Sequence, residues 1–142
     1  MHATHSTRAR EWSPRSGLDT ELVKASVWWD ALRAPAYLGD RVLAQLGDEC
    51  GAVIRDPYAH RLYWLISPGT AAGWHFPEVA RVQVLGAASW VAVPPRDRVR
   101  LPGLHWARPV EDGRVLTDPD TLYATLTAVI ADALGPRQGV AP

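Results

Sequence analysis

The middle of the chain alternates short apolar runs with turn-forming residues, a pattern that is typical of β-strands. Residues 51–56 and 60–66 are rich in β-branched and aromatic side chains, and they are followed by Asp-Pro and Ser-Pro-Gly sequences. A third run, residues 82–95, is bent by three small residues and ends at a Pro-Pro pair. These runs predict the central sheet, with an antiparallel hairpin first and either a bend or a second hairpin inside the third run.

Apolar residues recur at helical spacing on both sides of this region. Residues 18–34 carry such a stripe and predict a first amphipathic helix, and residues 37–46 predict a short second one. The strongest stripe follows Thr117 and Asp118, either of which can cap a third helix, and a Gly-Pro pair stops it. Residues 104–107 predict a short edge strand.

This order of elements predicts an α+β fold, with an antiparallel sheet of four to five strands and three helices packed on one face. A length of 142 residues fits one domain. We expect residues 1–17 to form a flexible tail, residues 18–136 the domain, and residues 137–142 a C-terminal tail.

Strand alternation assigns the side chains of residues 60–66 to two faces of the sheet. The two sets are Arg61, Tyr63 and Leu65, and His60, Leu62, Trp64 and Ile66. Because the second set is mostly apolar, we expect it to face the helices. This interpretation leaves Tyr63 exposed and turns His60 toward the core.

Charge and cysteine content narrow the classes of function. Fifteen basic and fifteen acidic residues give the chain no net charge, so no overall electrostatic field attracts a polyanion. Any site for a polyanion must therefore be a local patch. The single cysteine, Cys50, excludes an intramolecular disulfide, and we expect it to be a small buried apolar group. The chain shows neither a signal peptide nor an apolar run of transmembrane length, so we expect a cytoplasmic protein without membrane contact.

Motifs for common catalytic chemistry are absent from the sequence. Its glycines match neither the phosphate-loop nor the dinucleotide spacing, and no Gly-x-Ser-x-Gly elbow occurs. The candidate metal ligands do not repeat at a ligand spacing; they are Asp56, His60, His75, Glu78 and His105. We therefore predict no catalytic residues, no metal and no cofactor.

A basic loop is the clearest candidate for a binding surface. Arg96, Arg98 and Arg100 alternate along it, and His105 and Trp106 follow. In an extended loop the three guanidinium groups can point to one side, where an aromatic ring can stack on a base of single-stranded nucleic acid. The alternative is a solvated loop whose side-chain stems pack on the sheet.

Two stretches resemble bifunctional DNA primase/polymerase domains, which are similar to archaeo-eukaryotic primases. Residues 59–68, Ala-His-Arg-Leu-Tyr-Trp-Leu-Ile-Ser-Pro, approximate the family pattern Gly-x-His-Leu-Tyr-Tyr-x-x-x-Pro. Residues 82–95 follow its pattern Val-Asp-Val-Arg-Gly-x-Gly-Gly-Tyr-Val-Val-Ala-Pro-Pro, and residues 105–106 echo a later Tyr-x-Trp-like element. The resemblance implies an RRM-like central sheet.

The same resemblance implies a lost active site. Such polymerases use paired Asp residues and a later Asp to hold two divalent ions, whereas this chain offers only Asp56 and has Gln83 at the later position. His60 is retained. We therefore expect no polymerase or primase activity.

Together these observations predict a non-catalytic binding or regulatory protein. Its partner is another protein or a single-stranded nucleic acid, and homodimerisation through a sheet edge or Trp28 is also expected. Further candidate binding residues on the sheet are Arg55, His60, Tyr63 and Trp90. An alternative is an enzyme or ligand-binding protein with an aromatic pocket, formed by Trp64, Trp74, Trp90 and His75.

Overall fold

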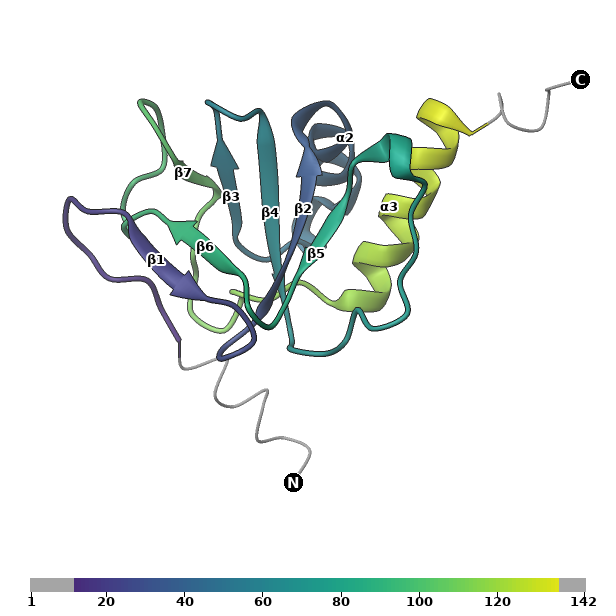
Figure 1. The fold of residues 1–142 in the computed structure, drawn as a ribbon. Coiled ribbons are helices and arrows are strands. Elements are labelled where there is room, and N and C mark those ends of the chain that lie inside the picture. The colour runs from purple at the N-terminus through teal and green to yellow at the C-terminus, as the bar shows by residue number, and fades with distance from the viewer. Residues whose placement is uncertain (1–11, 136–142) are drawn as a thin grey trace, which may run out of the picture.

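The structure is a computed structural model that describes residues 12–135. Its strands are β1 Glu21–Lys24, β2 Asp30–Pro35, β3 Val53–Asp56, β4 Arg61–Ile66, β5 Gln83–Leu85, β6 Trp90–Val93 and β7 His105–Arg108. Its α-helices are α2 Ala36–Leu46 and α3 Pro119–Leu134, and its 3₁₀-helices are η1 Gly47–Glu49 and η2 Glu78–Ala80. Five strands form an antiparallel sheet in the order β5-β2-β4-β3-β7, while β1 and β6 form a two-stranded sheet that we call the ribbon (Figure 1). The protein is therefore an α+β fold with antiparallel sheets.

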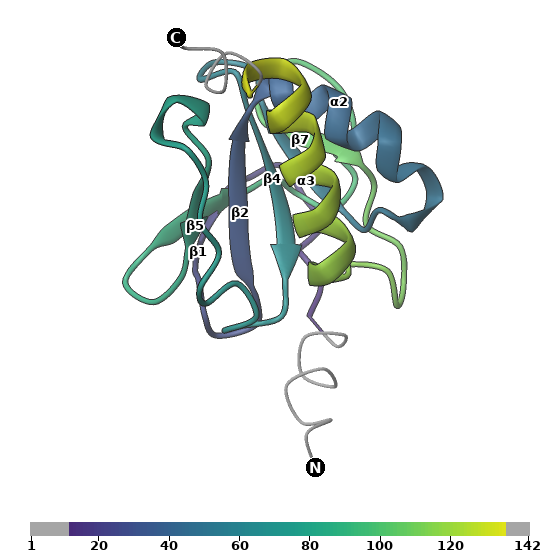
Figure 2. The ribbon, with the colours of Figure 1, turned by 90° about the vertical axis from the view of Figure 1, so that its right-hand side faces the viewer.

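One face of the five-stranded sheet is covered by α2 and α3 (Figure 2). Leu62, Trp64 and Ile66 of β4 are fully buried there against apolar residues of both helices. These three residues alternate along β4, so the face predicted for them is confirmed. His60 is an exception because it precedes the strand and is exposed in the turn.

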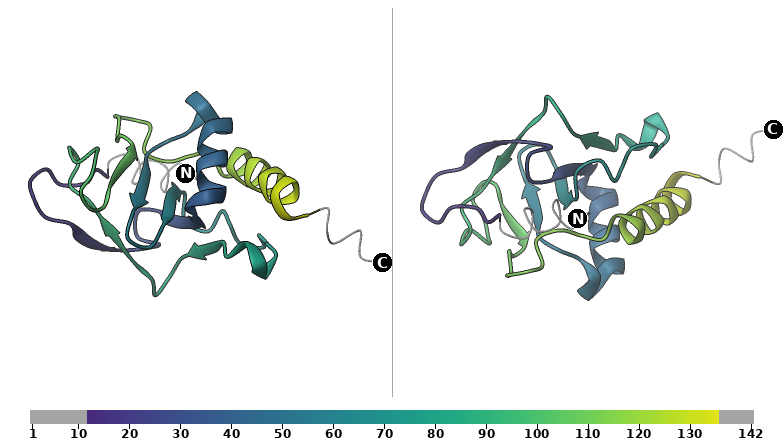
Figure 3. Two further views of the ribbon diagram at one scale, coloured as in Figure 1. Left: turned by 90° about the horizontal axis from the view of Figure 1, so that it is seen from above. Right: turned by 90° about the horizontal axis from the view of Figure 1, so that it is seen from below.

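The opposite face of the sheet is only partly covered, by the ribbon together with residues of the turn before β2 and of the segment after β7 (Figure 3). Ala31, Ile54 and Leu65 of the sheet share a buried cluster with Val91 and Val93 of the ribbon. A second core therefore lies on the side of the sheet that the sequence predicted to be free.

The ribbon is the bent continuation of the β2–β5 pair. Glu21 pairs with Val93 in the ribbon, and Ala31 pairs with Leu85 beyond the bend, so the same two chain segments pair twice. The Asp30 carboxylate holds the bend, since it accepts hydrogen bonds from the Ser26 hydroxyl at 2.6 Å and from the Gly69 N–H at 2.8 Å.

The helix predicted over residues 18–34 is wrong, because this segment forms β1, a turn and β2. Of the three predicted α-helices, only α2 and α3 occur in residues 12–135. Residues 82–95 contain β5 and β6, which pair with β2 and β1 and not with each other. Partners elsewhere in the fold override the local pattern in both segments.

The other predicted elements are confirmed. The β3–β4 hairpin is antiparallel, β7 lies at an edge of the sheet, and the Asp118 carboxylate caps α3 by accepting the Thr121 N–H at 2.9 Å. Residues 12–17 of the predicted tail contact the domain, since the Trp12 ring lies 5.4 Å from the Trp29 ring. Residues 1–11 and 137–142 of the two predicted tails lie outside the described part of the chain.

Neither helix within residues 12–135 has the length and apolar character needed to cross a bilayer.

Candidate functional site

The basic loop predicted as a binding surface is tied to the domain. Arg96 donates hydrogen bonds to Ser13 and to Asp112, and Arg98 donates one to the Leu18 carbonyl at 2.8 Å. Trp106 is 1% exposed, and its indole N–H points to the carbonyls of Pro94 and Pro95 at 3.2 and 3.1 Å. Trp106 therefore cannot stack on a base. Of the three loop arginines, only Arg100 has no hydrogen bond or ion pair to another described residue.

The other predicted site residues are dispersed. His105 is buried, with Nδ1 2.9 Å from the Gly103 carbonyl, and Arg55 forms an ion pair with Asp40 of α2. Trp90 lies on the ribbon, where it is 59% exposed. None of these side chains faces the same cavity as His60.

The predicted aromatic pocket does not form either. Trp64 is fully buried beneath the helices, whereas Trp74 packs its ring 4.9 Å from Tyr123 and 6.1 Å from Phe76. With Trp90 on the ribbon, the predicted residues cannot surround one ligand. Trp74 instead anchors the loop before η2 to α3.

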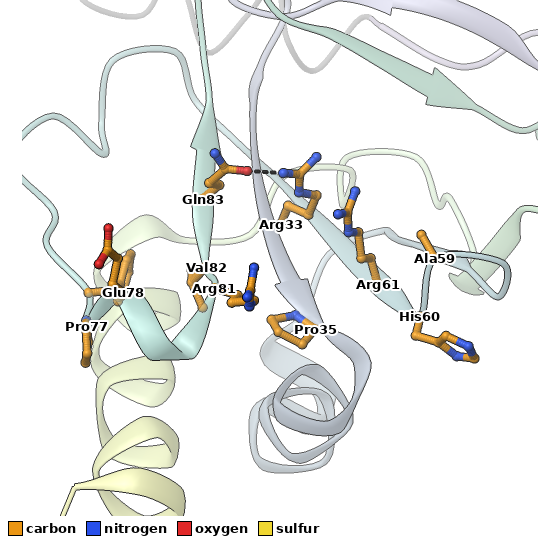
Figure 4. A pocket seen from close by; sticks show the side chains of 11 residues that line it. Arg33, Pro35, Ala59, His60, Arg61, Pro77, Glu78, Arg81, Val82 and Gln83 are labelled. Atoms are coloured by element: carbon orange, nitrogen blue, oxygen red, sulfur yellow. Dashed lines mark hydrogen bonds between the residues drawn. The ribbon is translucent and has the colours of Figure 1, made fainter.

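A different pocket lies where the ribbon leaves the sheet uncovered, and we call it the arginine pocket. Its volume is about 460 Å³. It is lined by residues of β2, the β3–β4 turn and the start of β4, the η2 region and β5 (Figure 4), namely Arg33, Pro35, Ala59, His60, Arg61, Phe76, Pro77, Glu78, Arg81, Val82 and Gln83.

Strand register places the polar groups of the arginine pocket in a row. Gln83 of β5 lies directly opposite Arg33 of β2, and the Arg33 guanidinium donates a hydrogen bond to the Gln83 side-chain oxygen. Arg61 of β4 pairs with Pro35, so it is a diagonal neighbour of Arg33, at about 7–8 Å. The row thus crosses three neighbouring strands on one face of the sheet.

Tyr63 belongs to the same face as this row. It lies directly opposite Arg33 across the β2–β4 pair and is partly buried beside the ribbon-side cluster. Along β4 it lies between Arg61 and the buried Leu65, and it is less exposed than the sequence predicted.

The β3–β4 turn fixes one end of the pocket. The Asp56 carboxylate accepts the N–H groups of Tyr58 and Ala59 at 2.9 and 3.1 Å, so it serves the turn. His60 follows with φ 57°, and its carbonyl accepts the Ala36 N–H at 2.7 Å. Arg81, at the entry to β5, also has a positive φ of 55°. Left-handed backbone at non-glycine residues costs free energy, and two of these residues line one pocket.

Charge in the arginine pocket is not balanced locally. Within residues 12–135, no carboxylate lies within 4.0 Å of the Arg33, Arg61 or Arg81 guanidinium. Glu78 lines the pocket too, but it forms no ion pair with these arginines. The chain has no net charge, so this concentration of cations is local. Three guanidinium groups on one open surface suit a ligand with several anionic oxygens.

Cys50 offers no nucleophile to this or any other site. It is 5% exposed in the helix-side core, which confirms the predicted burial. Burial raises the pKa of its thiol above the ordinary value of 9.0, while the neighbouring Trp64 and Thr117 side chains lower it by less. The thiol therefore stays protonated near neutral pH.

The part of the chain that the structure describes contains no group of three or more His, Cys, Asp or Glu side chains arranged to hold a metal ion. Comparisons with family models, with curated proteins and with solved structures found no match to this chain.

Proposed function

We propose that this chain is a non-catalytic binding protein that holds single-stranded nucleic acid in the arginine pocket. One observation carries the proposal: Arg33, Arg61 and Arg81 line one open pocket, and no carboxylate among the described residues lies within 4.0 Å of their guanidinium groups. Guanidinium groups bind phosphate oxygens through paired hydrogen bonds. Consecutive phosphates of one strand are natural partners for a row of arginines.

The surroundings of the row favour a single strand over a duplex. The arginines lie on a sheet surface beside the raised ribbon, and η2 borders the other side (Figures 3 and 4). A flexible strand with unstacked bases can follow such a surface, and sequence-specific RNA recognition mostly targets single strands of this kind. The resemblance of residues 59–68 and 82–95 to primase/polymerase domains supports a nucleic acid as the ligand.

Binding without catalysis follows from the same residues. The Asp56 carboxylate is engaged by turn N–H groups, and Gln83 stands where the resembling polymerases carry a metal-binding Asp. A neutral amide bonded to an arginine is a poor ligand for Mg²⁺. We expect no incorporation of labelled nucleotide on a primed template with Mg²⁺ or Mn²⁺. Incorporation that disappears in His60→Ala would contradict this part of the proposal.

The direct test is fluorescence anisotropy with a labelled oligothymidylate of about 12 nucleotides, a length that a small module can cover. Affinity should fall as salt rises from about 50 to about 200 mM, because bound phosphates release counterions. Arg33→Ala and Arg61→Ala should each weaken binding roughly tenfold and reduce the slope of log affinity against log salt by about 0.7.

Arg100→Ala is the matched control, because Arg100 is an exposed arginine outside the pocket. It should leave both affinity and salt slope close to those of the original protein. Absence of binding at low salt, or equal losses in all three variants, would overturn the proposal and favour a protein partner.

A protein contact is the second candidate, and the outer face of the ribbon favours it. Leu22 is 66% exposed and Trp90 is 59% exposed on this face. Trp90 lies opposite Lys24, and Leu22 lies two residues before Lys24 on β1. A second copy of the chain is the partner that can be tested directly. Light scattering at high concentration should show a dimer that Trp90→Ser dissociates, and a monomer mass throughout would exclude it.

A further inference from the structure

The arginine pocket has two chemically different ends. Arg33, Arg61 and His60 occupy one end, Glu78 and Pro77 of the η2 region occupy the other, and Arg81 lies between them (Figure 4). A ligand that was anionic throughout would be repelled by the carboxylate of Glu78. The pocket therefore matches a ligand with an anionic part and a neutral part that donates hydrogen bonds.

Gln83 lies between the two ends, and its hydrogen bond fixes the orientation of its amide. An arginine can only donate, so the atom of Gln83 that faces Arg33 is the amide oxygen. Figure 4 shows the amide nitrogen on the side of Gln83 away from Arg33. Within residues 12–135 this nitrogen has no acceptor, so its two N–H groups are available to a ligand.

Glu78 supplies the complementary acceptors. Its side chain is exposed, and none of the ion pairs among the described residues involves it. A free carboxylate accepts two parallel hydrogen bonds with its two oxygens. The Gln83 amide and the Glu78 carboxylate thus offer one donor group and a pair of acceptors to a ligand in the pocket.

Among the nucleobases, guanine has the matching edge. Its O6 accepts a hydrogen bond, and the adjacent N1–H and N2–H₂ groups donate two. Thymine offers a single N–H on this edge, while adenine and cytosine offer a single amino group, so each would leave a carboxylate oxygen unused. Inosine keeps O6 and N1–H but lacks the amino group.

We infer that the η2 end of the arginine pocket reads a guanine base, with Glu78 accepting from N1–H and N2–H₂ and Gln83 donating to O6. This inference rests on the proposed function, in which the arginines hold the phosphates of the same strand. Phe76 and Pro77 border the base as apolar neighbours, and a volume of about 460 Å³ lies within the range of pockets for single small ligands.

The test compares oligothymidylates of one length that differ only at a single central base, which is guanine, inosine, cytosine or thymine. The guanine strand should bind about tenfold more tightly than the all-thymine strand, as a good paired contact provides. The inosine strand should fall between them, because it keeps one of the two donors to Glu78.

Glu78→Gln should abolish the preference for guanine without weakening the all-thymine strand. Glu111→Gln is the matched control, because Glu111 is an exposed acid outside the pocket, and it should keep the preference. Gln83→Leu should reduce the advantage of guanine and of inosine alike, since both carry O6.

The outcomes separate the inference from the proposed function. Equal affinities for all four strands, with binding that still depends on Arg33, would overturn guanine reading and leave the proposed function intact. A preference for cytosine would likewise overturn it. Absence of binding by every strand at low salt would overturn both.

Discussion

The two halves of one sheet face have opposite characters although the same strands build them. Ala31 and Leu65 are fully buried under the ribbon, while Arg33 and Arg61 stand in the open pocket a few residues away along β2 and β4. The small or apolar side chains of Ala31 and Leu65 let the ribbon pack on the sheet. The ribbon does not extend over the long, charged side chains of Arg33 and Arg61. A core and a binding surface can therefore share the same strands, two to four residues apart on one face.

The largest expected effect lies in the covered half. Trp106→Ala removes a fully packed ring and its bonds to two carbonyls, so we expect a loss of about 3–5 kcal/mol in the free energy of unfolding. Trp90→Ala, at an exposed tryptophan of the ribbon, should cost about 1 kcal/mol or less. Urea denaturation followed by circular dichroism measures both. Equal losses would show that the ribbon does not cover a core.

The bend between the halves comes next in size. Asp30→Ala leaves the Gly69 N–H and the Ser26 hydroxyl without their acceptor, and we expect a cost of about 1–3 kcal/mol. Asp19→Ala is the control, because Asp19 is exposed and forms no ion pair within residues 12–135. If Asp30→Ala were as stable as the control, the bend would not depend on this carboxylate.

Backbone strain should distinguish the bend from the pocket. Ala88 in the bend and Arg81 in the pocket have φ values of 72° and 55°, so a glycine at either position should raise stability by up to about 1 kcal/mol. Oligonucleotide affinity should fall only for Arg81→Gly, since only Arg81 lines the pocket. Thermal unfolding and anisotropy on the same samples report the two effects, and a loss of affinity in Ala88→Gly would contradict the distinction.

The smallest effect on stability belongs to the open half. Arg61→Ala should change the free energy of unfolding by no more than about 0.5 kcal/mol, because its guanidinium forms no ion pair among the described residues. A larger loss, measured by the same denaturation, would show that Arg61 supports the fold and would weaken its assignment to a ligand.

The helix-facing side of the fold was predictable from sequence, and the ribbon side was not. In β4 the apolar residues alternate, and in α3 a clear stripe follows the cap at Asp118, so local pattern and final structure agree. β2 is different because both of its faces are buried, which removes the alternation that identifies a strand. The helical spacing over residues 18–34 joined Leu22, which is exposed in β1, to the buried Trp29 of the turn and Leu32 of β2.

The pocket was less predictable than the fold, for a related reason. The basic cluster that the sequence shows directly is Arg96, Arg98 and Arg100, because these residues lie close together in the chain. Arg33, Arg61 and Arg81 lie far apart in sequence, and only the pairing of β2 with β4 and β5 brings them together. Of the binding residues that the sequence suggested, only His60 lines this pocket, at one end of it.

The double pairing of two chain segments also bears on how the protein is made. Residues 21–35 supply β1 and β2, and the residues of β5 and β6 that pair with them lie 50 to 72 positions later, with the β3–β4 hairpin synthesised in between. A nascent chain that has emerged only as far as β4 can close the β2–β4–β3 sheet, but its ribbon-side core still lacks Val91 and Val93. Contacts of such long sequence separation form late and slowly. Apolar β1 and β2 surface is therefore open to chaperones until β6 has left the ribosome, and the arginine pocket is completed only when β5 arrives.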